Sequence, residues 1–153
     1  MILVTVGTTI PFDELIEEVD RLAAAGIFRE HVICQGGQSS YRASCCEQFM
    51  AKPSIDDLIA ESSMVITHGG ATVIQLLITH KPFVAFPNPR GAGNHQASFL
   101  LRISAVTDIS WSRNVNDLEQ LFRERRSLGP SSIPTNIPRA GNIVRDALYS
   151  GAA

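Results

Sequence analysis

The chain has 153 residues, of which 44% are hydrophobic and 18% are charged, so it is large enough for one domain with a single core. Its formal net charge of -2 argues against nucleic acid as a partner, because a surface that follows phosphates normally needs a basic excess. No apolar stretch is long enough to span a bilayer, and the N-terminus lacks the basic residues and cleavage pattern of a signal peptide.

Apolar residues recur with strand-like and helix-like spacing in alternation. In chain order, we expect a strand over residues 2–6, a helix over 12–22, and strands over 32–34 and 48–51. Then follow a helix over 54–63, a strand over 64–67, a helix over 71–79, a strand over 83–86, a helix over 94–102, a strand over 106–109 and a helix capped by Asn114. This alternation predicts an α/β fold, a Rossmann-like parallel sheet flanked by helices.

The chain divides into two predicted parts. Residues 1–128 form the α/β domain, and the arginine-rich residues 123–126 at its end are expected to be a solvated helix face. Residues 129–153 contain three prolines followed by a helical apolar pattern, so we expect a proline-rich linker and a C-terminal helix. In a parallel sheet, binding residues gather where the strands end, and four loops stand at such positions.

The first two loops suit an anion. Gly7, Thr8 and Thr9 lead from a strand into a helix and can offer backbone N–H groups and hydroxyls, although glycine there could equally serve only a tight turn. The second loop is more specific, because two glycines let a ligand approach the backbone at a helix start. Its residues are Thr67, His68, Gly69, Gly70, Ala71 and Thr72. A lone histidine is more often structural, but its place before Gly-Gly favours ligand contact for His68.

The other two loops are polar. Residues 86–96 end in Asn94, His95 and Gln96, consecutive hydrogen-bonding side chains of the kind that bind sugar hydroxyls. The alternative is that Asn94 caps a helix and its two neighbours are merely exposed. Residues 35–39 are glycine-containing and are expected to approach the ligand or a partner.

A metal site is not expected. There is no Asp-x-Asp pair to hold a divalent ion on a sugar nucleotide, and the four histidines lack zinc spacing. The three cysteines are an odd number without metal-ligand spacing, so we expect reduced packing thiols in a cytoplasmic protein. Phosphate charge would then be balanced by backbone amides, helix dipoles and His68.

These loops, in this order, resemble the C-terminal, donor-binding domain of the glycosyltransferase-B superfamily. The small single-domain branch is most similar; it includes the catalytic subunit of the dolichol-linked split N-acetylglucosaminyltransferase and exopolysaccharide subunits of the PssE type. The resemblance covers about residues 1–122 and is carried by residues 4–9 with Phe12, residues 67–70, Lys81 and Pro82, residues 86–88, and residues 94–96.

The resemblance implies a UDP-sugar as donor and no further cofactor. By position, Gly7, Thr8 and Thr9 would face the diphosphate. The residues that would bind the rest of the nucleotide sugar are His68, Gly69, Gly70, Thr72, Asn88, Asn94, His95 and Gln96. Where the family usually has a glutamate that binds the ribose hydroxyls, this chain has Gln75, whose amide makes the same contacts without charge assistance.

The resemblance also implies a partner. The acceptor-binding half would be a membrane-associated subunit that recruits this chain to the inner face of the membrane, binds a lipid-linked glycan acceptor and supplies the general base. The C-terminal helix could dock on that partner or pack on its own sheet. The leading hypothesis is an inverting UDP-sugar transferase subunit; the alternatives are a non-catalytic nucleotide-sugar-binding module and an epimerase or hydrolase.

Overall fold

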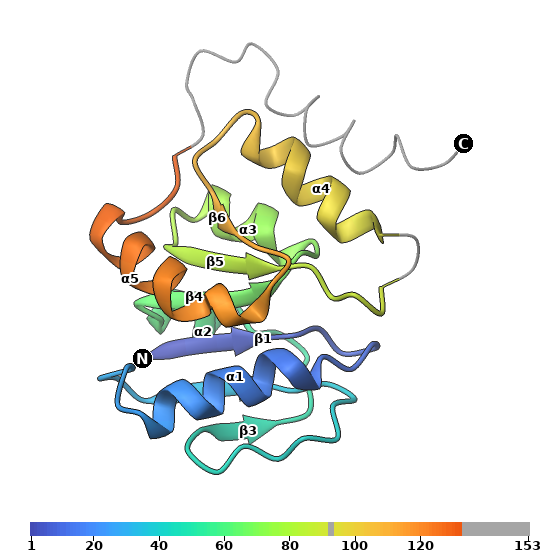
Figure 1. Cartoon of the computed structure of the whole chain (residues 1–153), viewed down its shortest axis with the longest axis vertical. Helices are drawn as coiled ribbons and strands as arrows, with labels where there is room; N and C mark the ends of the chain where they lie inside the picture. The colour runs from blue at the N-terminus through green and yellow to red at the C-terminus, as the bar shows by residue number, and fades with distance from the viewer. Residues whose placement is uncertain (92–93, 133–153) are drawn as a thin grey trace.

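A computed structural model of the chain describes residues 1–91 and 94–132. Six strands form one parallel sheet in the order β3-β2-β1-β4-β5-β6 (Figure 1). The strands are β1 (Ile2–Thr5), β2 (Val32–Gln35), β3 (Glu47–Phe49), β4 (Met64–His68), β5 (Phe83–Phe86) and β6 (Ser110–Trp111). The Rossmann-like α/β fold predicted from the alternating pattern is confirmed.

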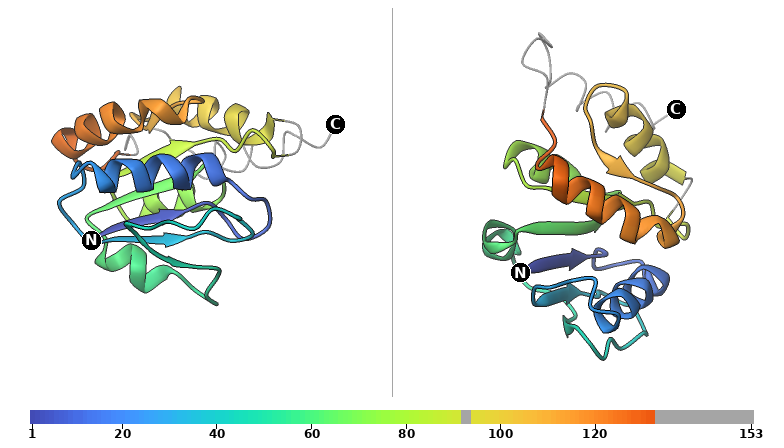
Figure 2. Two further views of the ribbon diagram at one scale, coloured as in Figure 1. Left: turned by 60° about the horizontal axis from the view of Figure 1, so that its bottom comes forward. Right: turned by 60° about the vertical axis from the view of Figure 1, so that its left-hand side comes forward.

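Helices cover both faces of the sheet (Figure 2). They are α1 (Asp13–Ala24), α2 (Asp56–Glu61), α3 (Thr72–Ile78), α4 (His95–Ser104) and α5 (Leu118–Leu128), the last preceded by a 3₁₀ turn, η2 (Val115–Asp117). The Asn114 side chain accepts the N–H of Asn116, so this asparagine caps the turn as predicted. Each helix predicted within the described residues is present within a few residues of its expected bounds.

The core lies on both faces because the central strands are buried on both sides. All four residues of β1 and of β5 are buried, which explains their unbroken apolar sequences. On one face, Ile2 and Val4 belong to a cluster with α1 and α5. On the other face, Leu3 packs with α2, α3 and α4. Alternation along β1 therefore joins the two halves of the core.

Strand order reverses next to β1. The chain moves outward from β1 to β2 and β3, returns to pair β4 with β1, and then continues to β5 and β6. Parallel α/β sheets bind ligands at this switch point, beyond the carboxyl ends of the two strands. The loops that follow β1 and β4 are therefore the first place to look for a site.

The last predicted strand was misplaced. Residues 106–109 are not a strand: the N–H groups of Val106 and Thr107 donate to the carbonyl of Ile103, which extends the turn at the end of α4. The strand begins at Ser110, which pairs with Val84 of β5. Its two residues are too few to produce a period-2 pattern, and the nearby apolar residues gave a misleading signal.

The basic end of α5 is not simply a solvated face. Arg123 is exposed, but Arg125 is only 2% exposed and bonds to the start of β6. Its Nε donates to Oγ of Ser110 at 2.9 Å, and its Nη1 donates to the carbonyl of Gly129 at 3.3 Å. A buried arginine of this kind satisfies backbone carbonyls that helices and strands leave unpaired.

The cysteines are all free thiols. Cys34 is buried in the core as predicted, whereas Cys45 is exposed, so that thiol is not a packing residue. Burial raises the pKa of Cys34 to about 12. Helix α5 ends at Leu128, and the predicted C-terminal helix falls outside the described residues. No helix in the described part of the chain is long and apolar enough to cross a membrane.

Candidate functional site

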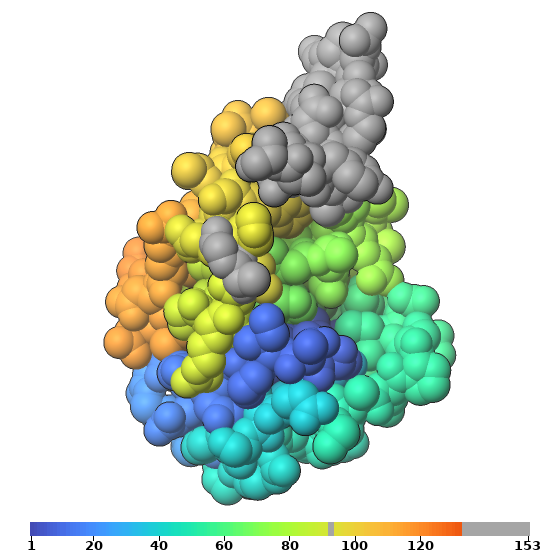
Figure 3. Space-filling view, turned by 90° about the vertical axis from the view of Figure 1, so that its right-hand side faces the viewer, coloured from blue at the N-terminus to red at the C-terminus, as the bar shows by residue number. Residues whose placement is uncertain are grey.

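A cavity of about 270 Å³ opens where the strand order reverses. Its lining comes from the loop after β1, the end of β4, the loop after β5 and the first turn of α4. The lining residues are Val6, Gly7, Thr8, Thr9, Ile10, His68, Asn88 and Gln96. Figure 3 shows this face, with the blue β1–α1 segment lying beside the yellow segment that precedes α4. Three of the four predicted loops therefore contribute to one cavity.

The imidazole of His68 fills the space between two glycines. A Cβ on Gly70 would lie 2.4 Å from Nε2 of His68, and a Cβ on Gly7 would lie 3.2 Å from the same atom. Gly7 also has a φ of +82°, which disfavours any side chain there. The glycines are thus required by the position of the histidine ring.

The protonation state of His68 follows from its surroundings. Nδ1 lies 3.4 Å from the carbonyl oxygen of Thr5, so the proton of a neutral ring belongs on Nδ1. Burial lowers the pKa of His68 below its usual value, against the opposing effect of this hydrogen bond. The ring is therefore neutral near neutral pH, and a bound anion would favour adding a proton at Nε2.

The polar loop after β2 bonds to the residues on either side of the loop that lines the cavity. Gln35 is buried and its Oε1 accepts the hydroxyl of Thr5 at 2.7 Å. Ser39 is also buried, and its Oγ accepts the N–H of Phe12 at 3.1 Å. Neither residue lines the cavity; the two side chains bond to β1 and to the residue before α1, and the N–H groups of Gly36 and Gly37 donate to the end of β3. The predicted approach of this loop to a ligand or partner stays a prediction.

Asn88 and Gln96 line the cavity and are bonded to each other. The backbone N–H of Asn88 donates to Oε1 of Gln96 at 2.7 Å. Asn88 is buried, with a relative exposure of 5%, and its side chain faces the β1–α1 loop. These two residues therefore join the β5–α4 loop to α4.

Other predicted site residues lie away from the cavity lining. Gln75 is half-buried on α3, and its Nε2 donates to Oδ1 of Asp56 at 2.5 Å. Asn94 and His95 are exposed at the start of α4, and the left-handed Asn94 (φ +59°) makes no side-chain capping bond. Gly69 is buried against α4, where a Cβ would meet Leu100 at 2.8 Å. Thr72 is half-buried at the start of α3. Their contacts with a ligand stay predictions.

The lining is uncharged apart from the titratable His68. Within the described part of the chain, no three His, Cys, Asp or Glu side chains are grouped so that they could hold a metal ion. The lining residues that the structure describes include no carboxylate and no lysine or arginine. The cavity can therefore offer N–H and O–H donors to an anion, and the unprotonated Nε2 of His68 is the one titratable group in the described lining.

The sequence matches the Glycosyltransferase family 28 C-terminal domain over residues 1–105. The chain belongs to this family. The matched region includes every residue that lines the cavity, and the fold is that of a glycosyltransferase-B half-domain. The donor-binding resemblance inferred from the loop motifs is confirmed at the level of this family.

A solved structure agrees with this family 28 assignment. The crystal structure of Acinetobacter baumannii MurG matches with a TM-score of 0.60 and 17% sequence identity, covering 83% of this chain and 42% of the MurG chain. The likeness shows a shared fold, and this chain spans less than half the length of the MurG chain. No curated protein sequence gives a significant match.

Sequence reasoning missed several residues that shape this family 28 cavity. Val6 and Ile10 line it, yet apolar residues beside a glycine loop carry no signal of their own. Arg90 lies outside the cavity but forms an ion pair with Glu14 at 2.6 Å. The pairing joins residues distant in the chain, so no local pattern could indicate it.

Proposed function

We propose that this chain is the donor-binding catalytic subunit of a split, inverting glycosyltransferase that acts in polysaccharide biosynthesis. It would move a sugar from a UDP-sugar to a lipid-linked acceptor. The observation that carries the proposal is the cavity at the switch point of a family 28 C-terminal domain, lined by glycine-rich loops and His68. Nucleotides bind at this place in Rossmann-like sheets.

The cavity suits the diphosphate of such a donor. The lining includes the β1–α1 loop residues Gly7, Thr8 and Thr9, which carry backbone N–H groups and hydroxyls, and the ring of His68 lies against Gly7. Neutral donors held in place stabilise the negative charge that develops on the leaving UDP. Gln96 also lines the cavity and would contact the sugar.

The reaction needs a base for the acceptor hydroxyl, and we place it outside this cavity, because His68 would take up a proton beside the diphosphate. In an inverting transfer, an acceptor hydroxyl attacks the anomeric carbon, its proton passes to a base, and the bond from that carbon to the UDP oxygen breaks on the opposite face. No carboxylate belongs to the described cavity lining. We therefore assign the base to an acceptor-binding partner associated with the inner face of the membrane, as the resemblance to single-domain transferase subunits implies.

The first prediction is that the chain binds UDP without a metal. We expect calorimetry to show the same affinity with magnesium and with EDTA, because neutral donors and His68 replace a bridging cation. The His68→Ala variant should bind about tenfold more weakly, the worth of one hydrogen bond to a charged group. His31→Ala is the control, since His31 is an exposed histidine at the amino-terminal end of β2, the opposite end of the strands from the cavity. Affinity that collapses on chelation would overturn the metal-free proposal.

The second prediction is that transfer requires the partner. Radiolabelled UDP-sugar should be turned over when the chain is mixed with membranes from its source cells, and not by the chain or washed membranes alone. The His68→Ala variant should reduce this turnover. Robust transfer by the chain alone would refute the split arrangement. Transfer that survives loss of UDP binding by the chain would instead favour a non-catalytic module, which the absence of a carboxylate from the described lining also allows.

A further inference from the structure

Two loops that line the cavity come from distant parts of the chain. The β1–α1 loop contributes Gly7 to Ile10, and the loop after β5 contributes Asn88. Neither stretch belongs to a helix or strand, so no ladder of backbone hydrogen bonds fixes the gap between them. The width of the cavity must therefore be set by side-chain contacts between the loops.

Asn88 makes those contacts with its whole amide. Its Nδ2 donates to the carbonyl oxygen of Pro11 at 3.0 Å and lies 3.4 Å from that of Ile10. Its Oδ1 accepts the N–H of Arg90 at 3.0 Å. Together with the backbone bond to Gln96, this buried residue connects three segments that surround the cavity. Both amide groups are already occupied by the protein.

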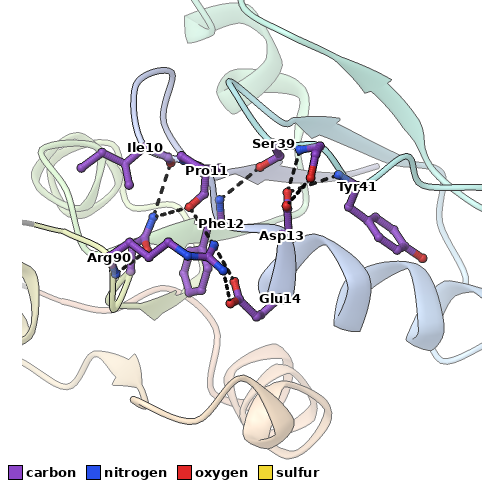
Figure 4. Close-up of polar contacts among 10 residues, drawn as sticks. Ile10, Pro11, Phe12, Asp13, Glu14, Ser39, Tyr41 and Arg90 are labelled. Atoms are coloured by element: carbon purple, nitrogen blue, oxygen red, sulfur yellow. Dashed lines mark hydrogen bonds and ion pairs between the residues drawn. The ribbon is translucent and has the colours of Figure 1, made fainter.

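Arg90 repeats the connection on the outside, as Figure 4 shows. Its guanidinium pairs with Glu14 at 2.6 and 3.1 Å and lies 3.4 Å from the carbonyl oxygen of Pro11. Both charged side chains are close to half exposed, so the pair contributes little energy by itself. Its two parallel bonds nevertheless fix the orientation of the loop around Asn88.

The β1–α1 loop is held on its other side as well (Figure 4). The N–H of Phe12 donates to Ser39, and the carboxylate of Asp13 accepts the N–H groups of Ser40 and Tyr41. With this side fixed, Asn88 is the buried contact that determines how far the loop stands from α4. Because the β1–α1 loop is held on both sides, it loses little conformational freedom when a ligand binds.

We propose that Asn88 is a positioning residue that sets the spacing of the donor cavity and the place of Gln96, and that it does not itself bind the donor. The identity of the ligand rests on the proposed function, whereas the positioning role rests on the contacts within the protein. Asn88→Asp is the sharpest variant, because it keeps an acceptor for the N–H of Arg90. Its second oxygen would face the carbonyl oxygens of Ile10 and Pro11 and repel them.

The test compares ¹H–¹⁵N spectra of the ligand-free protein, so it does not depend on UDP binding. In Asn88→Asp, the amide signals of residues 7–10 and the side-chain amide of Gln96 should shift. They should return toward wild type as the pH falls toward about 4, where the introduced carboxyl gains a proton and can donate again. Asn116→Asp is the control, because Asn116 is exposed on η2 and does not line the cavity.

UDP titrations of the same proteins complete the test. We expect affinity about tenfold lower in Asn88→Asp and unchanged in Asn116→Asp. Weaker binding with unchanged ligand-free spectra would overturn the proposal and assign Asn88 a direct contact. Unchanged spectra and affinity would overturn it as well. If Asn88→Asp fails to fold, Arg90→Gln should produce smaller shifts of the same signals, and their absence would count against the proposal. Failure of wild type to bind UDP would reject the proposed function alone.

Discussion

Replacing Gly37 with alanine is expected to lower the free energy of unfolding by roughly 2–5 kcal/mol and to distort the donor cavity. A Cβ on Gly37 would lie 2.2 Å from the carbonyl oxygen of Gly7 and 3.0 Å from Cα of Thr8. Both atoms are backbone of the loop that lines the cavity, so one loop must move. The φ of +55° at Gly37 adds the cost of a left-handed conformation.

Gly26→Ala separates these two costs. Gly26 also has a positive φ, +70°, but a Cβ there would meet nothing within 4 Å. This control should lose only about 1–2 kcal/mol and should bind UDP like wild type. Urea denaturation and UDP titration of both variants provide the measurement. Equal losses of stability in the two variants would show that the loops after β1 and β2 do not approach as closely as described.

Two other glycines, Gly7 and Gly70, show what a sequence can indicate. Gly70 was expected to let a ligand approach the backbone, because a strand precedes it and a helix follows, whereas Gly7 was left open between an anion-binding loop and a tight turn. The partner that approaches was not predictable in the same way. In the ligand-free structure, the atoms nearest to both glycines belong to His68, a residue of the protein itself. A local sequence pattern indicates that a glycine leaves space beside the backbone, but it does not indicate which group occupies that space.

The fold was predictable for a related reason. Strands buried on both faces must be apolar throughout, so β1 and β5 stand out without any knowledge of their neighbours. β6 has two residues and carries no such pattern, and its position was missed by a few residues. Edge strands need less apolar sequence because one side of each lies outside the ladder.

The contacts that assemble the site could not be predicted from the sequence. The bond from Asn88 to Pro11 spans 77 positions in the chain. Asparagine after a strand and before proline is common in loops, so its type suggested only a turn or a ligand contact. Only the folded arrangement shows that its amide is occupied by other parts of the chain.

Arg125→Ala is the second substitution with a large expected effect, a loss of roughly 2–4 kcal/mol in the free energy of unfolding. The guanidinium donates to Ser110, to the carbonyl of Asp108 and to the carbonyl of Gly129. Truncation would leave the buried Ser110 and the carbonyl of Gly129 without this donor, while the carbonyl of Asp108 would keep its bond from the Ser131 hydroxyl. Asp108 also pairs with Arg125 but is 60% exposed, so water can replace that part of the interaction.

Arg123→Ala is the matched control on the same helix. Arg123 is exposed and pairs with Glu119 one turn away, a contact worth about 0.3–0.5 kcal/mol. Urea denaturation should therefore separate two arginines that sequence reasoning placed on one solvated face. Equal, small losses would mean that Arg125 is not held in the interior.

UDP binding distinguishes the Arg125 variant from the Gly37 variant. Arg125 bonds to Ser110, the first residue of β6, and so acts at the amino-terminal end of a strand. The cavity lies at the carboxyl ends of β1 and β4, across the sheet. Below the denaturation range, Arg125→Ala should consequently keep wild-type affinity for UDP, although its stability is lower. Gly37→Ala should lose both, because the atoms that it displaces belong to the cavity loop itself. A parallel loss of UDP affinity in Arg125→Ala would show that the amino-terminal end of β6 and the carboxyl ends of β1 and β4 are coupled.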